Sequence, residues 1–242
     1  MLNDDKLLAN ISKLESVIGY TFKDKSNIIL ALTHSSFANE NKALKLYNNE
    51  RIEFLGDAVL NVVISEYIYN NYKDLSEGEL TKLRVNIVCE SSLMKCANKI
   101  GLGKFLLLGK GEEASGGRER ASMLCDVFEA VIGAIYLDGG MESAKAFIFR
   151  QMKSLIENSV KVFSFADYKT RLQEIVQKST ATKIRYVVVE EKGPDHDKVF
   201  VINVKVNNKV VGVGEGKSKK EAEQNAAKDA IESGLINEIQ GD

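Results

Sequence analysis

Three carboxylates crowd one short stretch, "NERIEFLGDAVL" (49–60), that otherwise suits a buried helix. On a helix at 100° per residue, Glu50, Glu53 and Asp57 fall within an arc of roughly 60°. Apolar side chains take the opposite side of the same helix: Ile52, Leu55, Val59 and Val63. The pattern therefore predicts one helix with an acidic strip beside a packing face.

A second apolar stretch, "MLCDVFEAVIGAIYL" (123–137), contains no basic residue and carries two acids. Asp126 and Glu129 are three residues apart, so they share a helix face. Burying unpaired carboxylates costs several kcal/mol each, and basic partners are too few nearby. Clustered carboxylate oxygens suit Mg²⁺, which activates water and neutralises phosphoryl charge. If the two acidic strips face each other, they form a magnesium site.

Three of these acids have another interpretation. Glu50 and Asp126 would then cap the N-termini of their helices, and Glu53 would pair with a distant lysine. Glu77, in "LSEGELTKLR", either approaches the acidic cluster or is a first-turn acid of its own helix. The residues alone leave both alternatives open.

Other reactive side chains favour ordinary roles. His34 is expected to make a helix-end hydrogen bond, and Cys125 is expected to pack in the core. Arg118 and Arg120, in "SGGRERAS" (115–122), lie either in a solvated loop or against a phosphate. The stretch "GEGKSKK" (214–220) is no phosphate loop, because Val211 stands where that motif needs glycine. We therefore expect no nucleotide cofactor.

The elements that position these residues fall into two regions. Apolar residues recur at helical spacing through residues 1–153, and residues 154–167 look like a connector without helical period. Residues 168–237 form the second region. Its predicted elements are a helix at 169–179, strands at 183–191, 199–206 and 209–214, and a helix at about 218–233. Asn207 and Asn208 suit a two-residue hairpin turn.

Composition gives no bulk argument for a polyanionic partner. The 242 residues carry a net charge of −1, and residues 168–242 hold 13 Lys+Arg against 12 Asp+Glu, or +1. Any such partner must be bound by a local patch. The three cysteines lack metal-ligand spacing, the N-terminal stretch is no targeting signal, and no apolar run spans a membrane. We expect a cytoplasmic protein without a membrane partner.

One local patch stands at the start of the last helix. Lys217, Lys219 and Lys220 cluster there, although a helix N-terminus favours anions over cations. A solvated run of lysines is one interpretation. A phosphate partner is the other, because it removes the electrostatic conflict.

Together these motifs resemble the ribonuclease III family. "ALTHSSF", "NERIEFLGDAVL", "SEGELTKLR" and "DVFEAVIGAIYLDGG" follow the family order across the N-terminal region, and Ile52 in "IEF" replaces the commoner leucine. The resemblance implies Glu53, Asp126 and Glu129 as Mg²⁺ ligands and Asp57 with Glu129 as the catalytic pair. Mn²⁺ would be a possible substitute for Mg²⁺. Glu50 and Glu77 would be supporting acids.

Phe54 lies beside the acids rather than on the main apolar face. Its residue type favours a place in the core. The family resemblance implies instead that Phe54 inserts into a cavity of a second subunit, so that a homodimer cuts both RNA strands.

The C-terminal stretch "DYKTRLQEIVQ…GPDHDKVF…GEGKSKKEAEQNAA" resembles the double-stranded-RNA-binding domain. Such domains recognise duplex shape through minor-groove and phosphate contacts. The resemblance implies RNA contacts at seven residues: Gln173, Glu174, Pro194, His196, Lys217, Lys219 and Lys220. The family's K-K-x-A-K motif ends here in Glu223, which removes one lysine.

The predicted fold is an all-α catalytic domain of the ribonuclease III type (1–153), a linker (154–167) and a small α+β RNA-binding domain (168–237). The predicted function is Mg²⁺-dependent cleavage of double-stranded RNA to 5′-phosphate and 3′-hydroxyl ends, serving ribosomal RNA processing and messenger turnover. The rival is a protein that binds duplex RNA without cutting it.

Overall fold

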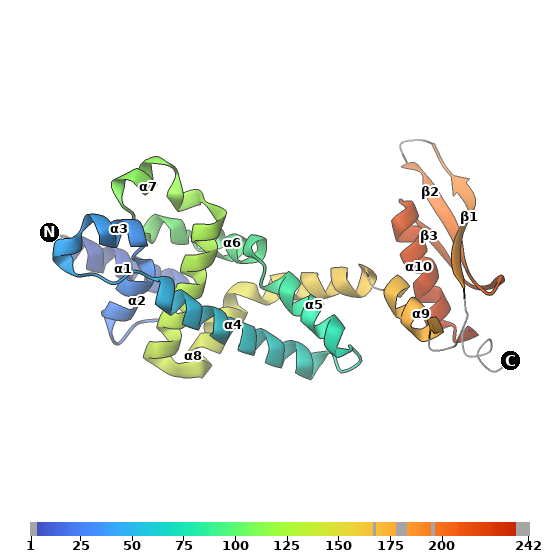
Figure 1. Cartoon of the computed structure of the whole chain (residues 1–242), viewed down its shortest axis with the longest axis horizontal. Coiled ribbons are helices and arrows are strands. Elements are labelled where there is room, and N and C mark those ends of the chain that lie inside the picture. Colours follow the sequence, from blue (N-terminus) through green and yellow to red (C-terminus); the bar gives the residue numbers. More distant parts are fainter. Residues whose placement is uncertain (1–3, 167, 178–182, 195–196, 236–242) are drawn as a thin grey trace. The chain divides into compact units, whose positions relative to one another are not determined.

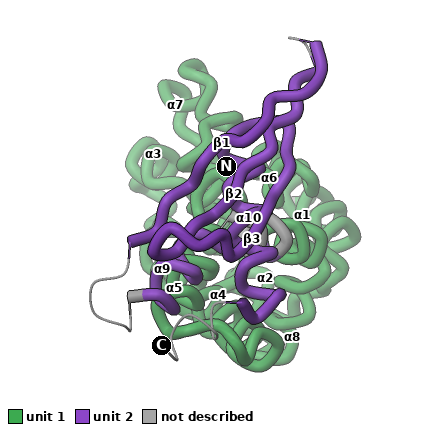
Figure 2. Tube along the Cα trace, turned by 90° about the vertical axis from the view of Figure 1, so that its right-hand side faces the viewer, with its two compact units in different colours: residues 1–159 green, residues 160–242 purple. Residues whose placement is uncertain are grey.

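The computed structural model divides the chain into two compact units, residues 1–159 and 160–242 (Figure 2). It describes residues 4–166, 168–177, 183–194 and 197–235. Among the helices of these residues, none combines the length and apolar character that crossing a membrane requires.

The first unit is helical, as the sequence predicted (Figure 1). Its α-helices are α1 (Asp4–Ile18), α2 (Lys25–Leu32), α3 (Ser35–Glu40), α4 (Glu50–Asn71), α5 (Glu77–Ile87), α6 (Glu90–Lys99), α7 (Lys110–Ala114) and α8 (Ala121–Ala166). Short 3₁₀ turns connect them: η1 (Lys42–Leu44), η2 (Leu102–Phe105) and η3 (Gly117–Glu119). Most of the helices contribute residues to the buried core, and α4 and α8 contribute the most buried apolar residues.

Helix α8 is the longest element and contains one break. At Gly140 the backbone has φ 74° and ψ −175°, which lies outside the helical region. The helix then continues to Ala166, so the prediction of a non-helical connector is wrong for residues 154–166. This segment has no strong apolar period, but it also lacks glycine and proline, and extending an existing helix needs no new nucleation.

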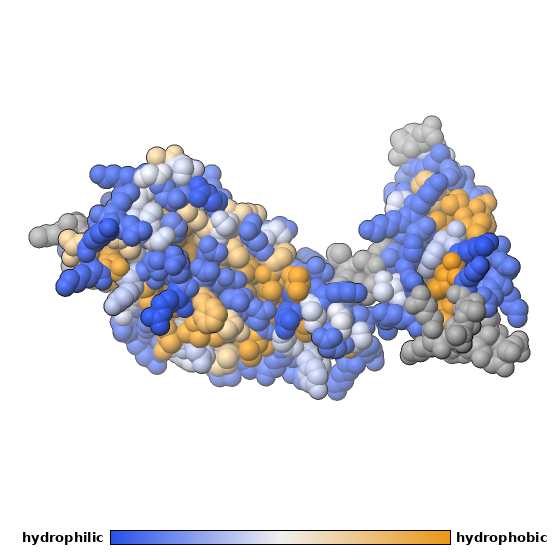
Figure 3. Space-filling view, in the orientation of Figure 1, coloured by the Kyte–Doolittle hydropathy of each residue, from blue (hydrophilic) through white to orange (hydrophobic). Residues whose placement is uncertain are grey.

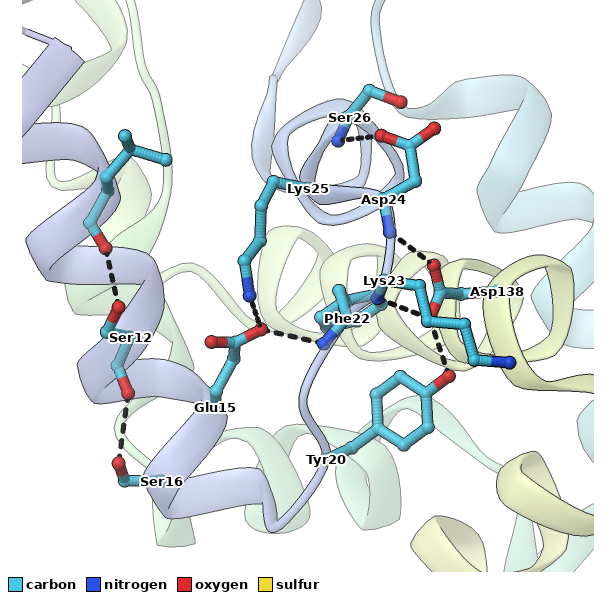
Figure 4. A network of polar contacts seen from close by, with 11 residues as sticks. Ser12, Glu15, Ser16, Tyr20, Phe22, Lys23, Asp24, Lys25, Ser26 and Asp138 are labelled. Carbon is cyan, nitrogen blue, oxygen red and sulfur yellow. Dashed lines mark hydrogen bonds and ion pairs between the residues drawn. The ribbon is translucent and has the colours of Figure 1, made fainter.

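The first part of α8 is anchored at its end by a polar network (Figure 4). Asp138 accepts hydrogen bonds from the Tyr20 hydroxyl at 2.7 Å, from Lys23 N at 2.9 Å and from Asp24 N at 2.8 Å. Burial and the Asp138 hydrogen bond raise the pKa of Tyr20 to about 12. The network ties the chain between α1 and α2 to the helix that carries Asp126 and Glu129.

The second unit is a three-stranded antiparallel sheet with two helices on one side (Figure 1). Its elements are α9 (Tyr168–Gln177), β1 (Ile184–Lys192), β2 (Val199–Val206), β3 (Lys209–Gly216) and α10 (Lys219–Glu232). Asn207 and Asn208 both have positive φ, 48° and 69°, which confirms the predicted tight turn. The order helix, three strands, helix is the predicted one.

The core of this unit lies between the sheet and its helices. Alternate residues of the strands point into it, and small residues of α10 let the helix lie close to β3. Its buried members include Leu172, Ile202, Val204, Val211, Ala226 and Ala230. The opposite face of the sheet has no layer of α9 or α10 over it.

Candidate active site

Two glycines let α4 and α8 cross at backbone contact. A Cβ atom on Gly56 would lie 1.8 Å from the carbonyl oxygen of Glu129, and one on Gly133 would lie 2.3 Å from that of Ile52. Only glycine therefore permits this approach. The crossing brings the acidic strip of α4 against the acidic face of α8.

The carboxylates at this crossing perturb one another. Burial, followed by the charges of Asp57, Glu53 and Asp126, raises the pKa of Glu129 to about 8. Burial, Asp126 and then Glu50 and Asp57 raise the pKa of Glu53 to about 7. The five predicted acids other than Glu77 thus form one electrostatic cluster across two helices.

Among the residues that the structure describes, no lysine or arginine neutralises this cluster. Within the described part of the chain, Glu53, Asp126 and Glu129 form no ion pair with either residue type. Only His34 lowers the pKa of Asp126, whereas burial and Glu90 raise it. Half-buried carboxylates without a base fit a divalent cation, which binds hard oxygen ligands. This donor set therefore fits the metal that the sequence implied.

The alternative interpretation of the acids finds no support. Asn49 is the N-cap of α4, so Glu50 follows the cap as the first helical residue. Asp126 lies in the second turn of α8, which begins at Ala121. Neither Glu50 nor Asp126 is therefore an N-cap.

The two remaining predicted acids, Asp57 and Glu77, are exposed rather than half-buried. Asp57 is exposed at the edge of the cluster, and the Asn61 side chain donates to its Oδ1 at 2.6 Å. Glu77 is exposed in the first turn of α5, where it accepts a hydrogen bond from Thr81 at 3.0 Å. Glu77 is not among the groups that shift the pKa values of Glu53, Asp126 or Glu129.

Two residues near the cluster were missed or misjudged, whereas the role of a third was predicted correctly. Glu90 begins α6 and raises the pKa of Asp126, which no local pattern indicated. Cys125 was expected in the core, but its Sγ and carboxylate oxygens of Asp126 and Glu129 lie within 4.8 Å of one another. Burial and the surrounding acids raise its pKa to about 12. His34 caps α3 by accepting from Ser36 N at 3.2 Å, which confirms its expected role.

The two arginines of the 115–122 stretch are engaged within the first unit. Arg118 Nη1 donates to the carbonyl oxygens of Gly103 at 2.9 Å and Leu106 at 2.7 Å. Arg120 pairs with Glu112 at 2.6 Å. Arg118 thus ties η3 to η2, which argues against a free phosphate contact at that side chain.

Phe54 lies on α4 and leaves 78% of its surface exposed, so it is not a core residue. A hollow of about 310 Å³ opens on the same unit. Its lining is Leu30, Tyr47, Asn48, Arg51, Ile52, Leu55 and Leu137. Residues 51, 52 and 55 flank Phe54 on α4, so an exposed aromatic ring and an apolar hollow are neighbours.

In the second unit, the predicted RNA contacts lie on α9, the β1–β2 loop and the start of α10. Gln173, Glu174 and Pro194 are exposed, and His196 lies outside the described residues. Lys217 pairs with Asp197 at 3.1 Å, and Lys219 pairs with Glu191 at 3.5 Å. These pairs place the start of α10 beside the β1–β2 loop.

A helical unit with a carboxylate cluster and an α+β unit with exposed lysines define a nuclease joined to a duplex-RNA-binding domain. The family models agree: residues 24–156 match the ribonuclease-III-like model, and residues 168–233 match the double-stranded RNA binding motif. The chain belongs to the ribonuclease III family.

Individual relatives cover most of the chain. Ribonuclease 3 of Caldanaerobacter subterraneus subsp. tengcongensis is 55% identical over 91% of this chain and 96% of the relative. Ribonuclease 3 of Clostridium perfringens is 49% identical over 92% of this chain and 93% of the relative. The chain is also similar to a solved nuclease domain of ribonuclease III from Campylobacter jejuni, with a TM-score of 0.56. That structure shows structural flexibility in a region involved in dimer formation. It is 47% identical and covers 60% of this chain and 96% of its own.

Proposed function

We propose that this protein is a Mg²⁺-dependent endoribonuclease that cleaves double-stranded RNA as a homodimer. The observation that carries the proposal is the meeting of Glu53, Asp57, Asp126 and Glu129 at the α4–α8 crossing, with pKa values of about 7 and 8 for Glu53 and Glu129. Family membership and relatives named ribonuclease 3 support the same activity.

Each acid has a proposed role. Glu53, Asp126 and Glu129 hold the cation, and Mn²⁺ substitutes because it accepts the same oxygen ligands. When bound, a divalent cation activates water and neutralises charge on the phosphoryl group. Asp57, fixed by Asn61, acts with Glu129 in catalysis at the open edge of the cluster. Glu50 and Glu77 are supporting acids, and Glu50 already contributes to the field at Glu53.

The reaction is a hydrolysis. The oxygen of water bonds to phosphorus, the bond from phosphorus to the 3′ oxygen breaks, and that oxygen takes a proton. The products are therefore a 5′-phosphate and a 3′-hydroxyl end. The cation would neutralise the negative charge of the carboxylates, because no lysine or arginine of the described residues pairs with them.

The proposed homodimer uses Phe54 and the hollow beside it. A two-fold axis makes each contact occur twice, so Phe54 of one protomer fills the partner's hollow and the reverse. Burying an exposed aromatic ring contributes roughly 1.5–3 kcal/mol per side chain. The same α4 carries Glu53 and Asp57, so association also places the two acidic clusters relative to each other.

The second domain supplies duplex affinity. We place it at residues 168–237, after a catalytic domain at 1–153 and a linker at 154–167. Gln173, Glu174, Pro194 and His196 would meet minor-groove hydroxyls. The RNA phosphates would be bound by Lys217, Lys219 and Lys220. Lys217 would exchange its ion pair with Asp197 for a phosphate, and Lys219 would exchange its ion pair with Glu191. Cytoplasmic processing of ribosomal RNA and turnover of messengers are the proposed cellular roles.

A gel assay of a long RNA duplex separates cleavage from simple binding. Wild type with Mg²⁺ should produce short fragments with 5′-phosphate ends, whereas EDTA should leave the duplex bound and intact. Asp57→Asn and Glu129→Gln should each abolish cleavage while duplex affinity stays within about twofold of wild type, because phosphate contacts supply most of that affinity. Intact duplex in the wild-type reaction with Mg²⁺ would favour the non-cleaving binding protein instead.

A further inference from the structure

The open face of the β-sheet carries a basic hollow at one end. It encloses about 320 Å³ and is lined by Lys183, Arg185, Lys205, Asn207 and Asn208. Side chains alternate along a strand, and the strand neighbours of the cations pack into the helix-covered core: Ile184, Tyr186, Val204 and Val206. Arg185 and Lys205 therefore project from the face that α9 and α10 leave uncovered.

The charges in this hollow repel each other. Arg185 and Lys205 are direct cross-strand partners in the register of β1 and β2, and like charges at such positions destabilise a sheet. Lys183 adds a third positive charge. None of these three side chains forms an ion pair with an acid of the described chain.

Most of the described lysines elsewhere in the same unit are paired. Examples are Lys169 with Glu223 at 2.6 Å, Lys192 with Glu190 at 3.2 Å and Lys217 with Asp197 at 3.1 Å. The basic hollow thus differs from its surroundings in two ways. Two positive charges face each other across the strands, and no described acid pairs with them. An anion bound there would relieve the repulsion.

The rest of the open face does not attract an anion, so binding is expected only at the end with the basic hollow. The next outward row contains the exposed Val187 and Val213, and Figure 3 shows an apolar patch on this unit. Beyond the valines, Glu190 and Glu215 stand at the other end of the strands, where they pair with Lys192. Attraction for an anion is therefore local to the basic hollow.

We propose that Lys183, Arg185 and Lys205 form a second phosphate-binding site, which takes a backbone phosphate of an additional RNA segment. The proposal rests on the proposed function, since it presumes that the helix side of the unit already holds a duplex. Two ammonium groups, a guanidinium and two side-chain amides supply several donors, which suits the acceptor oxygens of a tetrahedral phosphate.

The site is separate from the predicted duplex contacts. Lys219 pairs with Glu191, near the end of β1, whereas Arg185 is near its start. Six residues of strand span about 20 Å at roughly 3.3 Å per residue. The two sites also use different faces of the sheet, so a straight duplex on the helix side does not reach the basic hollow.

Binding of two RNAs to the full-length protein in EDTA tests the proposal without cleavage. One RNA is a single duplex of about 16 base pairs, the length one such domain spans. The other carries the same duplex and a second arm joined by a flexible junction. The variant is Arg185→Gln/Lys205→Gln. The matched control, Lys192→Gln/Lys228→Gln, removes the same charge from cations that already pair with acids.

The variant should bind the two-arm RNA about tenfold more weakly than wild type, with a salt slope lower by roughly one unit. Its affinity for the single duplex should stay within about twofold of wild type, as should both affinities of the control. Equal losses on both RNAs would assign the basic hollow to the main RNA surface. Unchanged binding of both RNAs would remove it from RNA recognition. Either result overturns the proposal.

Inorganic phosphate distinguishes a free anion from an RNA phosphate. Amide resonances of Lys183, Arg185 and Asn207 should shift saturably with phosphate at constant ionic strength in wild type, and not in the double variant. Shifts with phosphate but no effect on two-arm RNA would mean that the hollow takes the free ion, contrary to the proposal. A wild type that fails to bind the single duplex would contradict the proposed function itself, and the phosphate titration would still report on the hollow.

Discussion

Glu129 shows how its surroundings change the proton affinity of a side chain. Burial alone raises its pKa, and the charges of Asp57, Glu53 and Asp126 raise it further, to about 8. Burial and neighbouring acids likewise raise the pKa of Glu53 to about 7. Near neutral pH both carboxyls are therefore partly protonated, and binding of a divalent cation there would release these protons.

This coupling predicts how stability depends on pH. A carboxyl whose pKa is raised on folding binds its proton more tightly in the folded state, so stability falls as pH rises from about 4.5 to about 8. In EDTA, the melting temperature of the first unit should fall by a few degrees across that window. Millimolar Mg²⁺ should reduce the fall, because the cation stabilises the ionised carboxylates.

Thermal scans between pH 5 and 8.5, with EDTA and with Mg²⁺, provide the measurement. Glu129→Gln removes the group with the higher pKa and should flatten the EDTA curve. Asp74→Asn, a change of an exposed acid between α4 and α5, is the matched control and should leave the curve as in wild type. A melting temperature that rises with pH in EDTA would contradict the assignment of these raised pKa values.

At the scale of elements, the crossing of α4 and α8 makes the site. Periodicity puts acids on one face of each helix, but the backbone approach at Gly56 and Gly133 sets how near those faces come. The Asp138 network then holds the end of the first part of α8 against the chain before α2. Small residues at the contact therefore determine the geometry of the acidic cluster as directly as the acids do.

Gly56→Ala tests this role of the crossing. A methyl group would overlap the Glu129 carbonyl, at 1.8 Å, and backbone cannot move aside as a side chain can. We expect a loss of about 1–3 kcal/mol in the free energy of unfolding, typical of overpacking, together with weaker Mg²⁺ binding. Chemical denaturation and isothermal titration with Mg²⁺ measure the two effects.

Gly78→Ala is the matched control for that variant. Gly78 lies in the first turn of α5, and nothing comes within 4 Å of a Cβ atom there. Since alanine is the better helix former, this change should be neutral or stabilise by roughly 0.5–1 kcal/mol. If Gly56→Ala behaved like Gly78→Ala, the close crossing would not control the site.

At the scale of the whole molecule, function depends on how protomers and domains combine. Phe54→Ala should weaken the proposed homodimer by roughly a hundredfold or more in dissociation constant, because about 1.5–3 kcal/mol of aromatic burial is lost at each of two symmetric contacts. Cleavage of both strands should fall with it. Sedimentation across a concentration series measures the dissociation constant.

Tyr69→Ala is the control, since Tyr69 is another exposed aromatic residue of α4. It lies four turns further along the helix and away from the hollow beside Phe54. Its substitution should leave self-association unchanged. Wild type that sediments as a monomer at micromolar concentration would refute the dimer.

Duplex affinity should depend on the second domain. Lys219→Ala/Lys220→Ala should weaken binding of all duplex sequences about equally and lower the salt slope by roughly one to two units. Cleavage should survive at low salt, because the acids lie in the first unit. Binding titrations at several salt concentrations measure the slope. Removing Lys219 also leaves Glu191 without that partner, so Glu191→Gln/Lys219→Ala/Lys220→Ala controls for the added negative charge.

An unchanged salt slope would move the phosphate contacts elsewhere. Arg118 is then a poor substitute, because its guanidinium already binds two carbonyl oxygens of the first unit. Arg120 pairs only at the surface with Glu112, where an ion pair contributes little, and is the better next variant.

The sequence by itself determined the elements and the residue types of the site. Helical spacing predicted the acidic strips, strand alternation predicted β1 to β3, and Asn207–Asn208 predicted the hairpin turn, all from interactions between residues close along the chain. It could not exclude a helix at residues 154–166, because a weak apolar period does not forbid extending a helix already formed.

Only the tertiary structure decided which of these residues meet. It joined Glu90 and Cys125 to the acids and kept Glu77 beside Thr81. It also opposed Arg185 to Lys205 across two strands. Such contacts depend on crossing geometry and strand register, which arise from packing between segments far apart in sequence. Gly56 and Gly133, each in the middle of a helix, were local signs of that packing, because glycine there costs stability unless another backbone must come close.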